Sequence, residues 1–240
     1  MESSKTQPTG RADGKQRHRQ GALVDVAIVV AVTLVAWFGE VAVADRLPWG
    51  DEGRGVLAVL AAALVAIALT RTRGGTFADL GFRRPPRWPT AILQALGILV
   101  AFIVAQNLAP LAMQPFYELP QPDLSRYDAV RSNLPLAIAL MLALPLTASI
   151  PEEVVYRGFL IARLERVLGG AWSAVAGQAL IFGLIHFQWG PGGIFVTTIM
   201  GAVWGAGFLL CGRNLWIVII AHSIGHIAFV LQLYSAAPPN

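Results

Sequence analysis

The sequence predicts an all-α polytopic membrane protein with about seven transmembrane helices, within a range of six to eight, and a candidate functional core in the C-terminal four. Apolar residues make up 55% of the 240 residues, charged residues only 13%, and the mean hydropathy is +0.60. A soluble domain usually carries about 25% charged residues, so this chain lacks the charge to cover a water-soluble globule. The composition excludes a disordered chain, a nucleic-acid-binding protein and an ordinary cytosolic enzyme.

Seven apolar runs follow a polar, basic stretch at residues 1–20, which we expect to be a disordered cytoplasmic tail. Each run approaches the ~20 residues that a helix needs to cross ~30 Å of hydrocarbon, and backbone groups in lipid must be paired within the helix. We therefore divide the chain into the tail, N-terminal helices and loops at 21–132, and a core at 133–235. The runs cover about 21–44, 55–70, 89–111, 134 to beyond 151, 171–187, 194–210 and 215–234.

The basic residues predict how the chain is oriented. Fourteen of the 18 Lys and Arg residues fall in the tail, in segments 71–88 and 157–166, and at Arg213. The positive-inside rule then places the N-terminus in the cytoplasm and, with seven spans, the C-terminus outside. The compact size and short loops favour a multi-pass protein of a prokaryotic inner (cell) membrane. Ala42-Val43-Ala44 also fits a signal-peptide cleavage site, but the apolar run before it is longer than the usual signal core and more spans follow.

Ionisable residues inside the apolar runs indicate where function lies, because they are costly to bury in lipid. Three of the four histidines lie inside such runs, and a double glutamate with an arginine lies in the fourth. Asp25 and Glu40 lie near the two ends of the first run, where both can reach the interface, so we assign them structural roles. The single Cys211 excludes an internal disulfide framework and any cysteine-based metal cluster.

The segment from Pro151 to Gly158 contains the glutamates. On a helix Glu153 and Arg157 are separated by four residues and can form a pair. Glu152 lies about 100° around the helix from Glu153 and has no charge partner within its own helix, so it can serve as a base near neutral pH. The alternative is that both glutamates extend to a cytoplasmic interface beside the nearby arginines.

The histidines occupy two further runs. His222 and His226 are also four residues apart and share one helical face, where they can hold a metal, relay a proton or donate to an oxyanion. His186 lies near the far end of the fifth run and, taken alone, fits a core histidine bonded to a carbonyl. One cluster that pairs these groups makes their burial cheaper than separate sites, and glutamate with several histidines suits water activation with or without zinc.

At these residues the sequence resembles the CPBP family of intramembrane proteases, which includes CAAX prenyl endopeptidases and bacteriocin-processing or self-immunity proteins (the older Abi family). The family pattern is Glu-Glu-x-x-x-Arg, Phe-x-x-x-His and His-x-x-x-Asn/Asp on successive spans. It is met here by Glu152-Glu153-Val154-Val155-Tyr156-Arg157, Phe182-Gly183-Leu184-Ile185-His186 and His222-Ser223-Ile224-Gly225-His226. Order and spacing match over roughly residues 134–230, and the first motif is the most specific.

The resemblance implies an endopeptidase that hydrolyses a peptide bond of a membrane-associated peptide or protein within the bilayer. Glu152 and His186 would hold and activate water, His222 would support the oxyanion, and Glu153 with Arg157 would fix the helix. His226 departs from the family's Asn or Asp, although a neutral imidazole still donates one hydrogen bond. The resemblance leaves open both a divalent metal such as zinc, on Glu152, His186 and His222, and a metal-free glutamate mechanism.

Two other functions fit the same residues. A non-catalytic membrane scaffold or immunity factor could use the polar cluster structurally. A small transporter could use a Glu/His proton relay, although transporters often contain inverted repeats and none is evident here. The substrate cannot be read from the sequence, and the partners expected are a membrane-associated peptide or protein and the lipid bilayer, with no nucleic acid.

Overall fold

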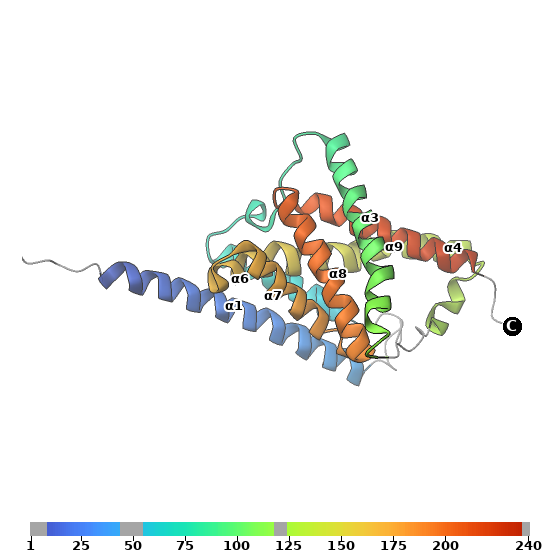
Figure 1. Ribbon diagram of the computed structural model, residues 1–240, viewed down its shortest axis with the longest axis horizontal. Helices are drawn as coiled ribbons and strands as arrows, with labels where there is room; N and C mark the ends of the chain where they lie inside the picture. Colours follow the sequence, from blue (N-terminus) through green and yellow to red (C-terminus); the bar gives the residue numbers. More distant parts are fainter. Residues whose placement is uncertain (1–8, 44–54, 118–123, 237–240) are drawn as a thin grey trace, which may run out of the picture.

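The computed structural model describes residues 9–43, 55–117 and 124–236, and every regular element in these ranges is helical. Figure 1 shows a bundle with α1 running along one side and α3 standing across α9. The α-helices are α1 (Thr9–Ala42), α2 (Val56–Thr72), α3 (Trp88–Met113), α4 (Leu134–Leu144), α5 (Ile150–Glu153), α6 (Ile161–Leu168), α7 (Ala171–Leu184), α8 (Gly190–Leu210) and α9 (Leu215–Ser235). The short elements are η2 (Phe77–Leu80), η3 (Ser125–Val130), η4 (Pro145–Ser149), η5 (Val154–Leu160) and η6 (Phe187–Trp189).

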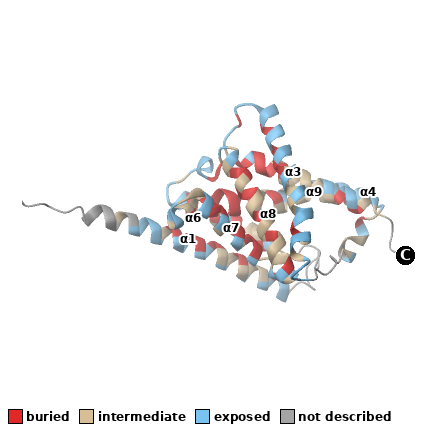
Figure 2. Ribbon diagram, in the orientation of Figure 1, coloured by how far each residue is buried: buried red, intermediate tan, exposed pale blue. Residues whose placement is uncertain are grey.

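All seven predicted apolar runs form helices, which confirms the all-α polytopic fold class. Two of the apolar helices, Val56–Thr72 and Ala171–Leu184, have fewer than 18 residues. The other five are long and apolar enough to cross a membrane: Gln16–Ala42, Trp88–Met113, Leu134–Leu168, Phe187–Leu210 and Leu215–Ser235. Figure 2 shows buried residues where α6, α7 and α8 meet and exposed residues along α3. Large apolar side chains are exposed on α3 and α4, as expected of faces that meet lipid.

The predicted disorder of the tail is wrong for residues 9–20, because α1 already begins at Thr9. The helix formed by the apolar run extends backwards through Ala, Lys, Gln and Arg residues, which have good helix propensity. Once a helix is nucleated, each further residue adds a hydrogen bond at low cost. Residues 1–8 lie outside the described part of the chain. The basic first turns of α1 project beyond the bundle (Figure 1).

The fourth run is one helical segment of 35 residues that changes its winding twice. Two π-helical stretches, η4 and η5, flank the single α-helical turn α5. Pro145 and Pro151 lack the backbone N–H that an α-helix uses, and both lie in or beside the first π stretch. Such π segments often occur at functional sites. Here they place Glu152 and Glu153 in the turn between them.

Small residues set how closely the core helices approach. α7 packs on α8, α8 packs on α3, and α4 packs on α9. A Cβ atom added at Gly201 would lie 3.2 Å from the Cα of Ala179, and one added at Gly205 would lie 3.0 Å from the Val175 side chain. These two glycines therefore let α7 and α8 approach closely, next to the glutamate turn.

Asp25 and Glu40 have structural roles, as predicted, but both are buried in the protein rather than extended to an interface. Asp25 is 1% exposed and pairs with Arg73, after α2, and with Arg163 on α6. Glu40 accepts hydrogen bonds from the backbone N–H groups of Gly55 and Leu57 at the start of α2, at 3.0 and 3.3 Å. The two carboxylates therefore fix the middle and the C-terminal end of α1 to its neighbours.

Candidate active site

Glu153 and Arg157 form the predicted pair, and it lies entirely inside the protein. Both side chains are 0% exposed, and Nη1 of Arg157 lies 3.2 Å from Oε1 of Glu153. The guanidinium also lies over the ring of Phe182, 5.1 Å from its centroid. A buried charge needs a partner of opposite sign, so this pair holds α5 and η5 in register.

His222 of α9 binds the same carboxylate. Its Nδ1 lies 2.8 Å from Oε1 of Glu153. The glutamate that contacts a membrane histidine is therefore Glu153, whereas the sequence predicted only Arg157 as its partner. In the tautomer whose Nδ1 carries a proton, Nδ1 donates to the carboxylate oxygen, and Nε2 points away from Glu153. Trp204 stacks on this imidazole at 5.0 Å between centroids.

Three buried polar atoms around this pair have no hydrogen-bond partner among the described residues. They are Oε2 of Glu153, Nε of Arg157 and Oε1 of Gln178. The Nε2 of Gln178 donates to the carbonyl of Gly201 at 2.7 Å, and Nη2 of Arg157 approaches the same carbonyl at 3.5 Å. Buried polar atoms are nearly always paired, so these atoms have the capacity to bind a small polar group.

His226 has a partner that the sequence did not reveal. Its Nδ1 lies 2.9 Å from Oγ of Ser149, in η4. The rings of His222 and His226 lie side by side, with centroids 4.6 Å apart. Ser149 precedes Glu153 by four residues, so serine and glutamate of one helical segment hold the two histidines of another.

His186 lies just beyond the end of α7, and its ring is fixed on one side. Its Nδ1 lies 2.6 Å from the carbonyl oxygen of Phe182. A carbonyl oxygen only accepts, so Nδ1 carries the proton and Nε2 keeps a lone pair. The ring lies between Phe182 and Trp189, at 4.7 and 4.8 Å. The structural interpretation and the catalytic one both remain compatible with this geometry, because Nε2 is free to accept.

Glu152 is half-buried, and its carboxylate makes no hydrogen bond or ion pair with any residue that the structure describes. Within the same residues, no hydrogen bond or ring contact joins Glu152, His186 and His222 to one another. The structure thus brings together Glu153, Arg157, His222 and His226. Glu152, in α5, and His186, after α7, make no contact of this kind with that group among the described residues.

A metal ion is the cofactor that the resemblance raises. In residues 9–43, 55–117 and 124–236, no three His, Cys, Asp or Glu side chains form a group that could hold one. Oε1 of Glu153 and Nδ1 of His222 are already used on each other. The observed donor set does not fit a metal site, and we derive no step through a metal.

Sequence reasoning missed Gln178, Ser149 and Trp204. Gln178 is a fully buried amide in the middle of an apolar helix, and the rule that intramembrane polar groups are functional could have found it. Ser149 could have been found by extending the Glu153–Arg157 spacing back by four residues. Trp204 gave no signal, because tryptophan is common in membrane helices.

Comparison with known families assigns this region. Residues 134–228 match the family described as type II CAAX prenyl endopeptidase Rce1-like. This part of the chain is therefore similar to the CAAX endopeptidases that belong to the family resembled by the sequence motifs. The match supports an intramembrane protease and a multi-pass membrane protein. Neither a curated protein nor a solved structure matches the chain in the corresponding comparisons.

The matched region extends from the start of α4 into α9. It contains every residue of the cluster around Glu153, from Ser149 to His226. Helices α1, α2 and α3 lie outside the match. They contribute to the site indirectly, because α3 packs on α8 and α9 while α2 packs on the glutamate segment.

Proposed function

We propose that the protein is an intramembrane endopeptidase that hydrolyses a peptide bond of a membrane-associated peptide or protein with a water molecule activated by Glu152 and His186. The observation that carries the proposal is the Glu153–Arg157–His222 network, whose glutamate and arginine are fully buried, inside the region that matches the CAAX endopeptidase family. A network of this kind holds an imidazole in one orientation, which is what electrostatic stabilisation of a reaction intermediate requires.

Each group has one task in the proposed reaction. Nε2 of His186 accepts a hydrogen bond from the water, and Glu152 takes a proton from it. The water oxygen then attacks the carbonyl carbon of the scissile peptide bond. His222, held by Glu153 through Nδ1, donates from Nε2 to the oxyanion, with His226 beside it. When the C–N bond breaks, Glu152 returns its proton to the leaving amine.

Glu152 suits the role of base better than Glu153 does. Oε1 of Glu153 accepts from both Arg157 and His222, so its charge is committed to holding them. Glu152 is only half-buried and has no such partner among the described residues. A free carboxylate in a partly dry setting can pick up and release a proton.

The experiment compares membranes that contain the native protein, Glu152→Gln, His186→Ala or the matched control Glu165→Gln. Glu165 belongs to the same helical segment, and its carboxylate is partly exposed and pairs with Arg213. Mass spectrometry of newly formed peptide C-termini detects cleavage of membrane proteins even where the substrate is unidentified. We expect the native protein and Glu165→Gln to produce the same termini and the other two variants to produce none, with all four folded in the membrane.

The same experiment separates the scaffold hypothesis from the enzyme. If Glu152→Gln and His186→Ala both keep the full set of termini, the proposed mechanism is wrong and the cluster is structural.

The proposal also includes a cell-membrane location with a cytoplasmic N-terminus and an extracytoplasmic C-terminus. A fluorescent-protein fusion at the N-terminus and a periplasmic alkaline-phosphatase fusion at the C-terminus should both be active. If both fusions are inactive, the chain has the opposite orientation.

A further inference from the structure

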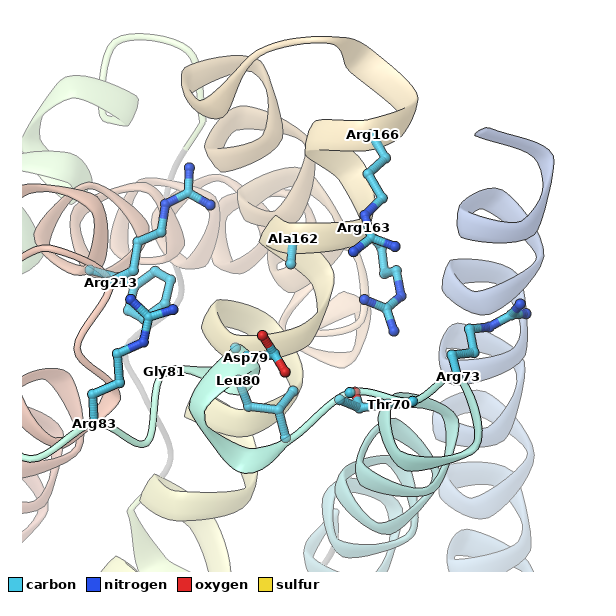
Figure 3. A pocket seen from close by; sticks show the side chains of 14 residues that line it. Thr70, Arg73, Asp79, Leu80, Gly81, Arg83, Ala162, Arg163, Arg166 and Arg213 are labelled. Carbon is cyan, nitrogen blue, oxygen red and sulfur yellow. The ribbon is translucent and has the colours of Figure 1, made fainter. Parts of the chain in front are cut away.

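A second polar site lies farther along the helical segment that contains the two glutamates, at residues 158–166. A pocket of about 380 Å³ is bounded by the end of α2, the loop that contains η2, the helix α6 and the turn between α8 and α9. Its charged lining consists of Asp79 and the five arginines Arg73, Arg83, Arg163, Arg166 and Arg213. Figure 3 shows Arg83 and Arg213 on one side of Asp79 and the other three arginines on the other side.

Backbone contacts hold the walls of this pocket in place. The carbonyl of Gly81 accepts from the N–H of Leu215 at 2.8 Å, and the carbonyl of Arg83 accepts from Nδ2 of Asn214 at 2.9 Å. A Cβ atom added at Gly158 would lie 2.6 Å from the carbonyl oxygen of Leu80. The loop is thus seated directly on η5 and on the start of α9, so the arginines converge on a fixed frame.

The carboxylates nearby balance only part of this charge. Asp25 pairs with Arg73 and Arg163, and Glu165 pairs with Arg213 through both of its oxygens. Arg83 and Arg166 form no ion pair with any described residue.

Asp79 accepts from the backbone N–H and the hydroxyl of Thr76. These bonds hold the pKa of Asp79 below its ordinary value. Five arginines therefore face three carboxylates in all, and the pocket keeps a positive excess.

We propose that this pocket binds a phosphate group, supplied either by the headgroup of an anionic phospholipid or by a small soluble phosphate compound. Guanidinium groups match phosphate oxygens in pairs and stay charged. The volume falls within the usual range for small-ligand pockets. The pocket lies at the end of the bundle where Arg73 meets α1, from which the basic first turns of that helix project. Basic pockets between membrane helices at such an end are suited to lipid headgroups.

The proposal is independent of the peptidase mechanism, since Arg83 and Arg166 belong to neither the Glu153 network nor the proposed reaction. The test uses the full-length protein in a neutral detergent at constant ionic strength. Phosphatidylglycerol, phosphatidylcholine and inorganic phosphate are each titrated while the unfolding midpoint is measured, because a ligand that binds the folded state raises the midpoint with its concentration. The same titrations are made on two double variants.

The first double variant, Arg83→Gln with Arg166→Gln, removes the two unpaired arginines of the pocket. The second, Arg84→Gln with Arg87→Gln, is the matched control: it removes the same charge from exposed positions of the same loop that do not line the pocket. We expect affinity to fall about fivefold for each pocket arginine, and so roughly 30-fold for the pair. The control should keep the native affinity within about twofold, since Arg84 and Arg87 do not line the pocket.

The titrations also identify the source of the phosphate group. A rise with phosphatidylglycerol but not with inorganic phosphate assigns a lipid headgroup, and a rise with inorganic phosphate alone assigns a soluble compound. The proposal is overturned if neither raises the midpoint, if phosphatidylcholine acts as strongly as phosphatidylglycerol, or if both double variants lose affinity equally, which would indicate general charge attraction.

Discussion

Asp25 and Glu153 are both buried carboxylates that contact two basic side chains, but their oxygens are used differently. One carboxylate oxygen of Asp25 accepts from Arg73, and the other accepts from Arg163. In Glu153, the single oxygen Oε1 binds both Arg157 and His222, while Oε2 has no partner among the described residues. The first arrangement is saturated and joins three helices. The second leaves capacity for a further polar group, which is the property that a reaction site needs and a structural tie does not.

The two sites also differ in their access to solvent. The Arg73 side chain is 46% exposed, whereas Glu153 and Arg157 are both 0% exposed. Water can therefore compensate part of the charge around Asp25 if a partner is lost, and cannot do so around Glu153. This contrast predicts that equivalent substitutions at the two carboxylates have unequal effects.

The largest effect is expected for Glu153→Gln. This change leaves Arg157 buried without a counter-charge, and breaking a buried pair from one side costs about 3–5 kcal/mol. The midpoint and free energy of unfolding in detergent measure the loss. Adding Arg157→Met to Glu153→Gln should restore much of the stability, because no unpaired charge remains. A Glu153→Gln protein as stable as the native one would show that the pair is not buried as described.

Asp25→Asn is expected to have a smaller effect, on stability alone. The neutral amide keeps one hydrogen bond but loses its charge, and a hydrogen bond to a charged group contributes about 2 kcal/mol. Unfolding in detergent gives the stability, and newly formed peptide C-termini in membranes give the activity. We expect folded Asp25→Asn to retain cleavage. Loss of cleavage in a well-folded variant would place Asp25 in the reaction and remove the contrast with Glu153.

The elements that could be predicted from sequence are those that depend on neighbours along the chain. Apolar runs predict the helices, and four-residue spacing predicts the Glu153–Arg157 pair. The contacts of His222 with Glu153 and of Arg163 with Asp25 join residues 69 and 138 positions apart. Such contacts depend on how helices cross, and spacing along one helix carries no information about crossing.

The π-helical segments were missed for a related reason. Pro145 and Pro151 indicate a disturbed helix, but whether the chain kinks or widens depends on the helices packed against it. The basic residues of segment 71–88 predicted an orientation, yet nothing local indicated that Arg83 would share a pocket with Arg166 and Arg213. Both features depend on how α2 and α9 pack against the helical segment that contains η4 and η5, which only the assembled bundle defines.

The smallest effect on stability is expected for Glu165→Gln, a third carboxylate that completes the series. Its bond to Arg213 is bidentate, at 2.7 and 3.0 Å, but the two side chains are 34% and 36% exposed. Solvent screens such a pair, so the change should cost only about 0.5 kcal/mol. It also frees Arg213 in the basic pocket, so the affinity for a phosphate group should rise about fivefold. Unfolding measurements with and without phosphatidylglycerol test both statements on one sample. A loss of stability as large as that of Asp25→Asn would mean that burial does not set the order of the three carboxylates.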